Sequence, residues 1–174
     1  MSKTRTKLVE HATECLQAKG YFGAGIREIL EGAEVPKGSL YHHFPMGKDD
    51  LVIEAIEAEI LQLREWLNFE QKEGDISQIA KLISYFDHRK EHSVFLWLLI
   101  GLESSAQKGK VYEACHEAFL QFRSMLTDLL PKQGSKDQNV DKVLAILLGT
   151  LSLLRISKDV KYKDQLINGL NIFT

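Results

Sequence analysis

Apolar residues recur at helical spacing in the first third of the chain. Leu8, Ala12, Cys15 and Leu16 share one side of the segment from about Lys3 to Lys19. Positions 26, 29, 30 and 33 are apolar in the same way. Spacings of three and four residues place side chains on one face of a helix. The pattern therefore predicts two amphipathic helices, 3–19 and 26–33.

A short third helix is predicted over residues 37–43. Glu34-Val35-Pro36 separates it from the preceding helix as a turn, and Phe44-Pro45 ends it, because proline disfavours helical geometry in the residue before it. Two short helices joined by a tight turn are typical of a helix-turn-helix. In such a pair the second helix lies in the DNA major groove.

The rest of the chain predicts longer helices and almost no strand pattern, so we expect an all-α fold. The expected helices are Gly47 to Phe69, Ile76 to Phe86, Ser93 to Glu103, Val111 to Leu130, Val140 to Ile156 and Asp159 to Phe173, with a loop over Lys132 to Asn139. Residues 140–156 are apolar on almost every face and must be covered on most sides. Gly149 and Ser152 would let another helix approach closely. Pairing the last two helices with their copies in a homodimer would cover them as a four-helix bundle.

Composition and charge indicate the cellular compartment and the kind of partner expected for the protein. The chain has 174 residues and is 44% hydrophobic, which suits a folded domain. Its net charge is −2, but residues 1–48 hold seven Lys/Arg and five Asp/Glu, a net +2. Positive potential in that segment favours contact with phosphate. No apolar run is long enough for a membrane helix and the start is charged, so we expect a soluble, cytoplasmic protein that contacts no membrane.

The first fifty residues resemble the DNA-binding domain of the tetracycline-repressor (TetR) family of bacterial regulators. The resemblance rests on the Gly20-Tyr21-Phe22 corner, IREIL at Ile26 to Leu30, KGSLYHHF at Lys37 to Phe44, and Lys48 at the start of the fourth helix. His92 to Glu103 (HSVFLWLLIGLE) also resembles the LmrA-like branch. The family implies a helix-turn-helix DNA-binding domain at 1–48 and a helical effector-binding and dimerisation domain at 49–174. It further implies a ligand-released repressor that binds a palindromic operator.

The candidate DNA contacts lie on the second and third helices and just beyond them. They are Gly25, Arg27, Lys37, Gly38, Ser39, Tyr41, His42 and Lys48. Lys37 and Tyr41 are four residues apart and share a face, while Leu40 and Phe44 would anchor the opposite face. Gly25 stands where the family usually has a hydroxyl cap. His43 is expected to complete the small core, and the basic start with Lys3, Arg5 and Lys7 to reach phosphates.

The candidate effector pocket gathers the aromatic residues of the middle helices. They are Trp66, Phe86, Phe95, Trp97, Phe119 and Phe122, with His88, His92, Glu103 and His116 as candidate polar partners. Such a mixture suits an apolar or planar small molecule held by a few polar groups. We expect this pocket between the helix that begins at Gly47 and the helices around Phe86 to Phe122. Aromatic residues at this spacing also form plain core.

Other functions have weaker support in the sequence. His88 and His92 have the i, i+4 spacing of a metal-binding pair, with Asp87 and Glu91 nearby, but a third ligand is not evident. Cys15 and Cys115 read as small buried apolar groups. The chain contains no nucleophile motif and no phosphate-binding loop, so we expect neither an enzyme nor a cofactor. A metal- or redox-responsive regulator, or a helical interaction protein without DNA binding, remains the alternative.

Overall fold

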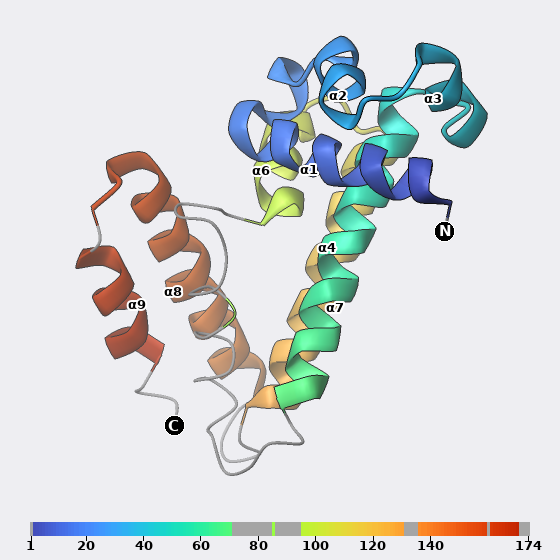
Figure 1. Ribbon diagram of the computed structural model, residues 1–174. Coiled ribbons are helices and arrows are strands. Elements are labelled where there is room, and N and C mark those ends of the chain that lie inside the picture. The colour runs from blue at the N-terminus through green and yellow to red at the C-terminus, as the bar shows by residue number, and fades with distance from the viewer. Residues whose placement is uncertain (1, 71–84, 86–94, 131–135, 160, 171–174) are drawn as a thin grey trace. The chain divides into compact units, whose positions relative to one another are not determined.

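The computed structural model describes residues 2–70, 85, 95–130, 136–159 and 161–170 (Figure 1). All regular structure in these residues is helical, so the predicted all-α class is confirmed. The helices are α1 (Lys3–Gly23), α2 (Ile26–Ala33), α3 (Lys37–His43), α4 (Lys48–Glu70), α6 (Leu96–Ser104), α7 (Lys110–Leu129), α8 (Lys136–Ser157) and α9 (Lys161–Leu170). The helix predicted over Ile76 to Phe86 lies outside the described residues, except for helical Tyr85.

The chain forms two compact units. The first contains Met1–Ile60 and Phe95–Phe119, and the second contains Leu61–Val94 and Leu120–Thr174. Both α4 and α7 thus contribute residues to each unit. This division reflects how the chain packs. The predicted domain boundary after residue 48 separates two expected functions, and it stays a prediction.

Helix α1 packs its apolar side into the first unit and then bends at Gly20. Leu8, Ala12 and Leu16 are fully buried, and the Ser2 hydroxyl caps the helix by accepting a hydrogen bond from the Arg5 N–H. At Gly20 the backbone adopts φ 71° and ψ −177°, a region that residues with a Cβ rarely enter. The expected corner at Gly20 is therefore a kink within α1, and helical structure continues to residue 23.

Helices α2 and α3 begin and end where the sequence predicts. Glu34 ends α2 in the left-handed conformation, with φ 56°. Pro36 precedes the first turn of α3 in an extended conformation, and Phe44 leaves the helix before Pro45. Leu40 and Phe44 are buried, so one face of α3 is fixed to the protein and the other is presented outward.

Besides the end of α1, two predicted helix boundaries are wrong by three residues or more. The helix expected from Ser93 begins at Leu96, because Phe95 is extended and the buried Glu59 carboxylate of α4 accepts the Leu96 N–H at 2.7 Å. The loop expected over Lys132 to Asn139 is helical from Lys136 onward. Residues 136–139 are polar but include no glycine or proline, so nothing in them stops a helix.

The second unit contains the carboxyl-terminal helices. Val140, Val143 and Leu147 bury one face of α8, and a Cβ on Gly169 of α9 would lie 3.0 Å from the Ile146 side chain. Gly169 thus permits close packing of α9 on α8. In the part of the chain that the structure describes, no helix combines the length and apolar character that a membrane span requires.

Candidate nucleic-acid interface and effector groove

Helix α3 separates its anchoring residues from its candidate DNA contacts. Leu40 is fully buried, whereas Lys37, Tyr41 and His42 are exposed and Ser39 is half-buried. Tyr41 keeps 47% of its surface exposed although it follows Leu40 directly. Exposed basic, hydroxyl and aromatic side chains on a fixed helix are the groups that contact phosphates and base edges.

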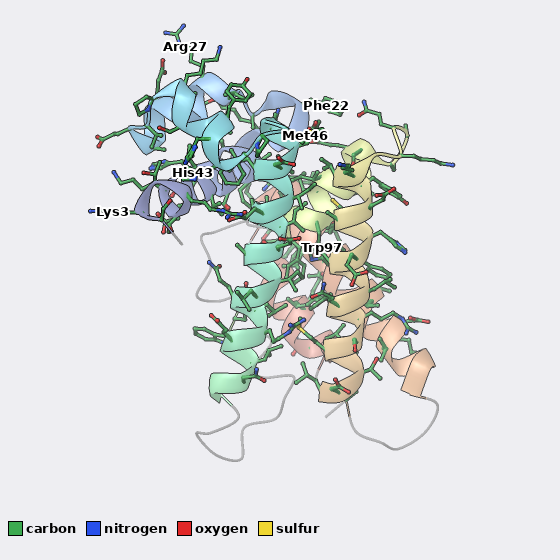
Figure 2. All side chains as sticks on the ribbon, turned by 90° about the vertical axis from the view of Figure 1, so that its right-hand side faces the viewer. Lys3, Phe22, Arg27, His43, Met46 and Trp97 are labelled. Atoms are coloured by element: carbon green, nitrogen blue, oxygen red, sulfur yellow. The ribbon has the colours of Figure 1, made fainter. Side chains whose placement is uncertain are left out.

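Arg27 of α2 lies beside this face of α3. Arg27, Lys37 and Tyr41 line one surface depression of about 760 Å³, together with Glu31, Glu34 and apolar residues of α2 and the following turn. The Arg27 side chain is 91% exposed and points away from the helices in Figure 2. Its guanidinium pairs with Glu31 at 2.7 Å, which raises the Arg27 pKa through the hydrogen bond to that carboxylate. The structure therefore brings three of the predicted contacts, Arg27 of α2 and Lys37 and Tyr41 of α3, to one surface.

Gly25 and Gly38 are not required by the packing of the chain itself. A Cβ added at either position would meet no atom within 4 Å, and neither residue has a positive φ. Gly38 lies in the first turn of α3, where alanine would favour the helix by up to ~1 kcal/mol. Glycine at these two positions leaves the backbone open to the approach of another molecule.

His43 differs from its neighbour His42. It is half-buried, and its Nε2 lies 3.5 Å from the Ser2 hydroxyl. The two imidazole rings are 4.9 Å apart at a steep angle. Since His43 is only half-buried, its expected place in the small core stays a prediction.

Lys48 has a partner within the protein. Its ammonium donates a hydrogen bond to the Tyr21 carbonyl and lies 4.7 Å from the centre of the Tyr21 ring. Burial lowers the pKa of Lys48, and the nearby Asp49 and Glu103 carboxylates oppose that shift. An ammonium has three donors, so Lys48 can keep this bond and still donate to a phosphate.

Arg5, expected to reach phosphates as part of a basic arm, is instead paired with a carboxylate of the protein. Its Nε donates to Glu54 Oε1 at 2.7 Å, and its Nη2 pairs with the other oxygen of the same carboxylate. The guanidinium also lies 5.5 Å from the centre of the Phe44 ring. The structure thus gives Arg5 a bracing role that the sequence did not predict.

Some of the predicted effector residues meet in a groove between α6 and α7. Trp97 and Phe119 line a depression of about 240 Å³ with Gly101, Tyr112, Cys115 and His116. The Phe95 ring stacks on Trp97 at 5.3 Å and is itself fully buried. Tyr112 was not anticipated, although its spacing from His116 and Phe119 places all three on one face of α7.

The remaining predicted pocket residues are not brought to this groove. Trp66 belongs to the second unit and lies 6.1 Å from the Tyr85 ring. Phe122 is fully buried in that unit, and Phe86 lies outside the described residues. Glu103, expected as a polar partner of the ligand, instead accepts a hydrogen bond from the Tyr21 N–H at 2.6 Å.

The cysteines and histidines do not form a reactive centre in the described part of the chain. Burial raises the pKa of Cys115 to about 12, and the Glu59 charge adds to the effect. Burial likewise raises the pKa of Cys15. A thiol is reactive mainly as thiolate, so these shifts disfavour reaction with oxidants. No group of three or more metal-binding side chains gathers in the described ranges, while His88 and His92 lie outside them.

Comparisons with known proteins agree with this geometry. Residues 8–55 match the family of bacterial regulatory proteins of the tetR type. The HTH-type transcriptional regulator LmrA of Bacillus subtilis is 28% identical over 154 residues, covering 83% of this chain and 80% of LmrA. The HTH-type transcriptional repressor DhaR of Mycobacterium sp. is 29% identical over 82 residues, covering 47% and 41% of the two chains.

A solved structure shows the same fold over nearly the whole chain. SCO4454, a TetR-family regulator from Streptomyces coelicolor, superposes with a TM-score of 0.84 at 19% identity, over 97% of this chain and 92% of that one. The two relatives are named as an HTH-type transcriptional regulator and an HTH-type transcriptional repressor, and not as enzymes. The chain belongs to the TetR family of bacterial transcriptional regulators.

Proposed function

We propose that the protein is a homodimeric repressor that binds a palindromic operator and releases it when a small molecule binds. The observation that carries the proposal is the outward face of α3, where Lys37, Tyr41 and His42 are exposed above the buried anchor Leu40. A helix fixed in this way can enter the major groove as a rigid body.

The candidate contacts divide by role. Lys37, Arg27 and Lys48 carry charges that suit phosphates, which supply affinity but no sequence information. Tyr41, His42 and Ser39 can donate to phosphates or to base edges. Gly25 and Gly38 leave the backbone accessible, and we assign them to close approach of the duplex. The predicted DNA-binding domain at 1–48 contains all of these candidates, and Lys48, the first residue of α4, is its last residue.

Dimerisation is proposed through α8 and α9. Leu153 and Ile156 of α8 are 47% and 81% exposed in the single chain, and Gly149 is exposed with open space where a Cβ would lie. A second copy would cover these apolar side chains by two-fold symmetry. Two copies would also present two α3 helices, which is what a palindromic operator requires.

The groove between α6 and α7 is the candidate effector site. Trp97, Tyr112 and Phe119 supply aromatic walls and His116 a polar group. At about 240 Å³ the groove suits a small planar molecule rather than a large one. Release requires that the effector bind more tightly to the conformation that does not fit DNA.

The proposal is tested by selecting tight-binding duplexes from a random pool and measuring their affinity by fluorescence anisotropy at several salt concentrations. We expect one enriched sequence. We also expect Lys37→Ala to flatten the salt dependence by about one unit of log–log slope. Lys110→Ala, an exposed lysine at the start of α7, is the matched control and should leave the slope unchanged. Absence of any enriched sequence would favour the helical interaction protein that does not bind DNA.

A further inference from the structure

The corner of α1 at Tyr21 connects three helices of the first unit. The Tyr21 N–H donates to Glu103 Oε2 of α6 at 2.6 Å. The Tyr21 carbonyl accepts a hydrogen bond from the Lys48 ammonium. The Tyr21 hydroxyl donates to Asp49 Oδ1 at 2.6 Å. One residue therefore joins the end of α6 to the first turn of α4.

Gly20 makes this arrangement sterically feasible. Its φ of 71° suits glycine, and a Cβ at this position would overlap the Glu103 carboxylate. Glycine at position 20 thus allows both the kink in α1 and the close approach of the Glu103 carboxylate. The kink also turns the Tyr21 N–H away from the regular helical ladder, and the carboxylate supplies its acceptor.

Helix α6 is held by a carboxylate at each end. The buried Glu59 of α4 accepts the Leu96 N–H at the start of α6, and Glu103 fastens its last turn to the corner of α1. Gly101 and Leu102, which line the effector groove, directly precede Glu103 in the same helix. A shift at this end of α6 must therefore act on the hydrogen bond to Tyr21.

We infer that Glu103 is a positioning residue for DNA binding, which orients Lys48 at the start of α4 by fixing the corner at Tyr21. The inference rests on the proposed DNA role of Lys48. Glu103 itself contacts no DNA in this account, and its effect passes through the Tyr21 backbone, whose N–H and carbonyl face the two partners. The same connection gives an effector in the groove a short path to the DNA-contacting residues.

The test compares two conservative variants of Glu103 on the duplex selected for the wild-type protein. Glu103→Asp keeps the charge but shortens the reach to the Tyr21 N–H, and Glu103→Gln keeps the reach but loses the charge. We expect Glu103→Asp to weaken binding about tenfold, and Glu103→Gln to stay within about threefold of the wild type. Glu113→Asp, an exposed carboxylate in the first turn of α7, should have no effect. Equal affinities for both Glu103 variants would overturn the inference.

A double-mutant cycle separates the positioning role from general structural damage. Lys48→Met removes the ammonium and keeps the aliphatic stem. In that background Glu103→Asp should change the affinity by less than about twofold, because its target is gone. Additive losses of affinity from the two substitutions would overturn the positioning role of Glu103, but not the DNA contact assigned to Lys48. A Lys48→Met protein that binds as tightly as the wild type would instead contradict the DNA contact assigned to Lys48.

Hydrogen exchange tests the same contact without any substitution, so the inference stays falsifiable if Glu103→Asp does not fold. The Tyr21 amide should be protected in the wild-type protein, and more strongly so with the selected duplex bound. Exchange of this amide at the rate of an open chain would overturn the inference.

Discussion

Arg5 and Glu54 form a two-pronged ion pair between the first turn of α1 and the buried side of α4. Arg5 Nε lies 2.7 Å from Glu54 Oε1, and the Glu54 residue is only 8% exposed. The pair links residues 49 positions apart in the sequence. It holds the start of α1 against α4, the helix that begins at Lys48.

Arg5→Met should therefore destabilise the protein rather than alter its contacts with DNA. Without the guanidinium, the largely buried Glu54 carboxylate loses its charged donors, and we expect the Tm to fall by about 3–6 °C. Arg27→Met is the matched control, since Arg27 pairs with Glu31 on the open surface and its loss should change the Tm by about 1 °C at most. Thermal unfolding followed by circular dichroism measures both. Equal changes in the two variants would show that Arg5 does not brace α1.

Gly38→Ala should have opposite effects on stability and on DNA binding. A methyl group at this helical position meets open space, so the Tm should rise by about 2–4 °C. The same methyl would stand between the backbone of α3 and the duplex, and we expect at least about a tenfold loss of affinity. Gly109→Ala, where a Cβ also meets open space, should leave DNA binding unchanged. Wild-type affinity of Gly38→Ala would show that the duplex does not approach the backbone of α3 at this position.

The boundaries of α2 and α3 could be predicted because local residues set them. Pro36 and Pro45 act on their direct neighbours, and the apolar spacing around Leu40 identifies the anchored face without knowledge of any other helix. Glycine at position 20 likewise marks the corner of α1.

The partners of Lys48, Arg5 and Glu103 could not be predicted, because they come from distant parts of the sequence. Tyr21 and Glu103 are separated by 82 residues, and periodicity within one helix carries no information about such a contact. For the same reason the aromatic residues of the middle helices could not be divided between the α6–α7 groove and the second unit. Cys115 could be expected to be buried, but the rise of its pKa to about 12 depends on how completely other helices bury it and, to a smaller extent, on the Glu59 charge.

Trp97 should report effector binding, and Trp66 should not. The two are the protein's only tryptophans, and Trp97 alone lines the groove between α6 and α7. We expect a planar compound that lowers operator affinity to quench the fluorescence of Trp66→Phe, in which Trp97 remains. Trp97→Phe should lose the quenching. Quenching retained in Trp97→Phe would move the effector site to the surroundings of Trp66.

Ile156→Glu should produce a folded monomer. The side chain is 81% exposed in the single chain, so a charge there conflicts only with an apolar partner surface. Leu151, at 3% exposure, is part of the chain's own core, and a charge at that position would test folding instead. Leu61→Glu, at a position 51% exposed on α4, is the control and should remain dimeric. Sedimentation and circular dichroism distinguish the outcomes, and a dimeric, folded Ile156→Glu protein would exclude this end of α8 from the interface.

The symmetry of the operator tests the central claim most directly. The selected duplex is compared with the same duplex in which one half-site is scrambled, at a single salt concentration. A dimer that presents two copies of α3 should select half-sites related by two-fold symmetry and spaced about one helical turn, or a multiple of it, apart. Scrambling one half-site should weaken binding by at least about a hundredfold. A selected site without two-fold symmetry, or equal affinity for the scrambled duplex, would contradict the account.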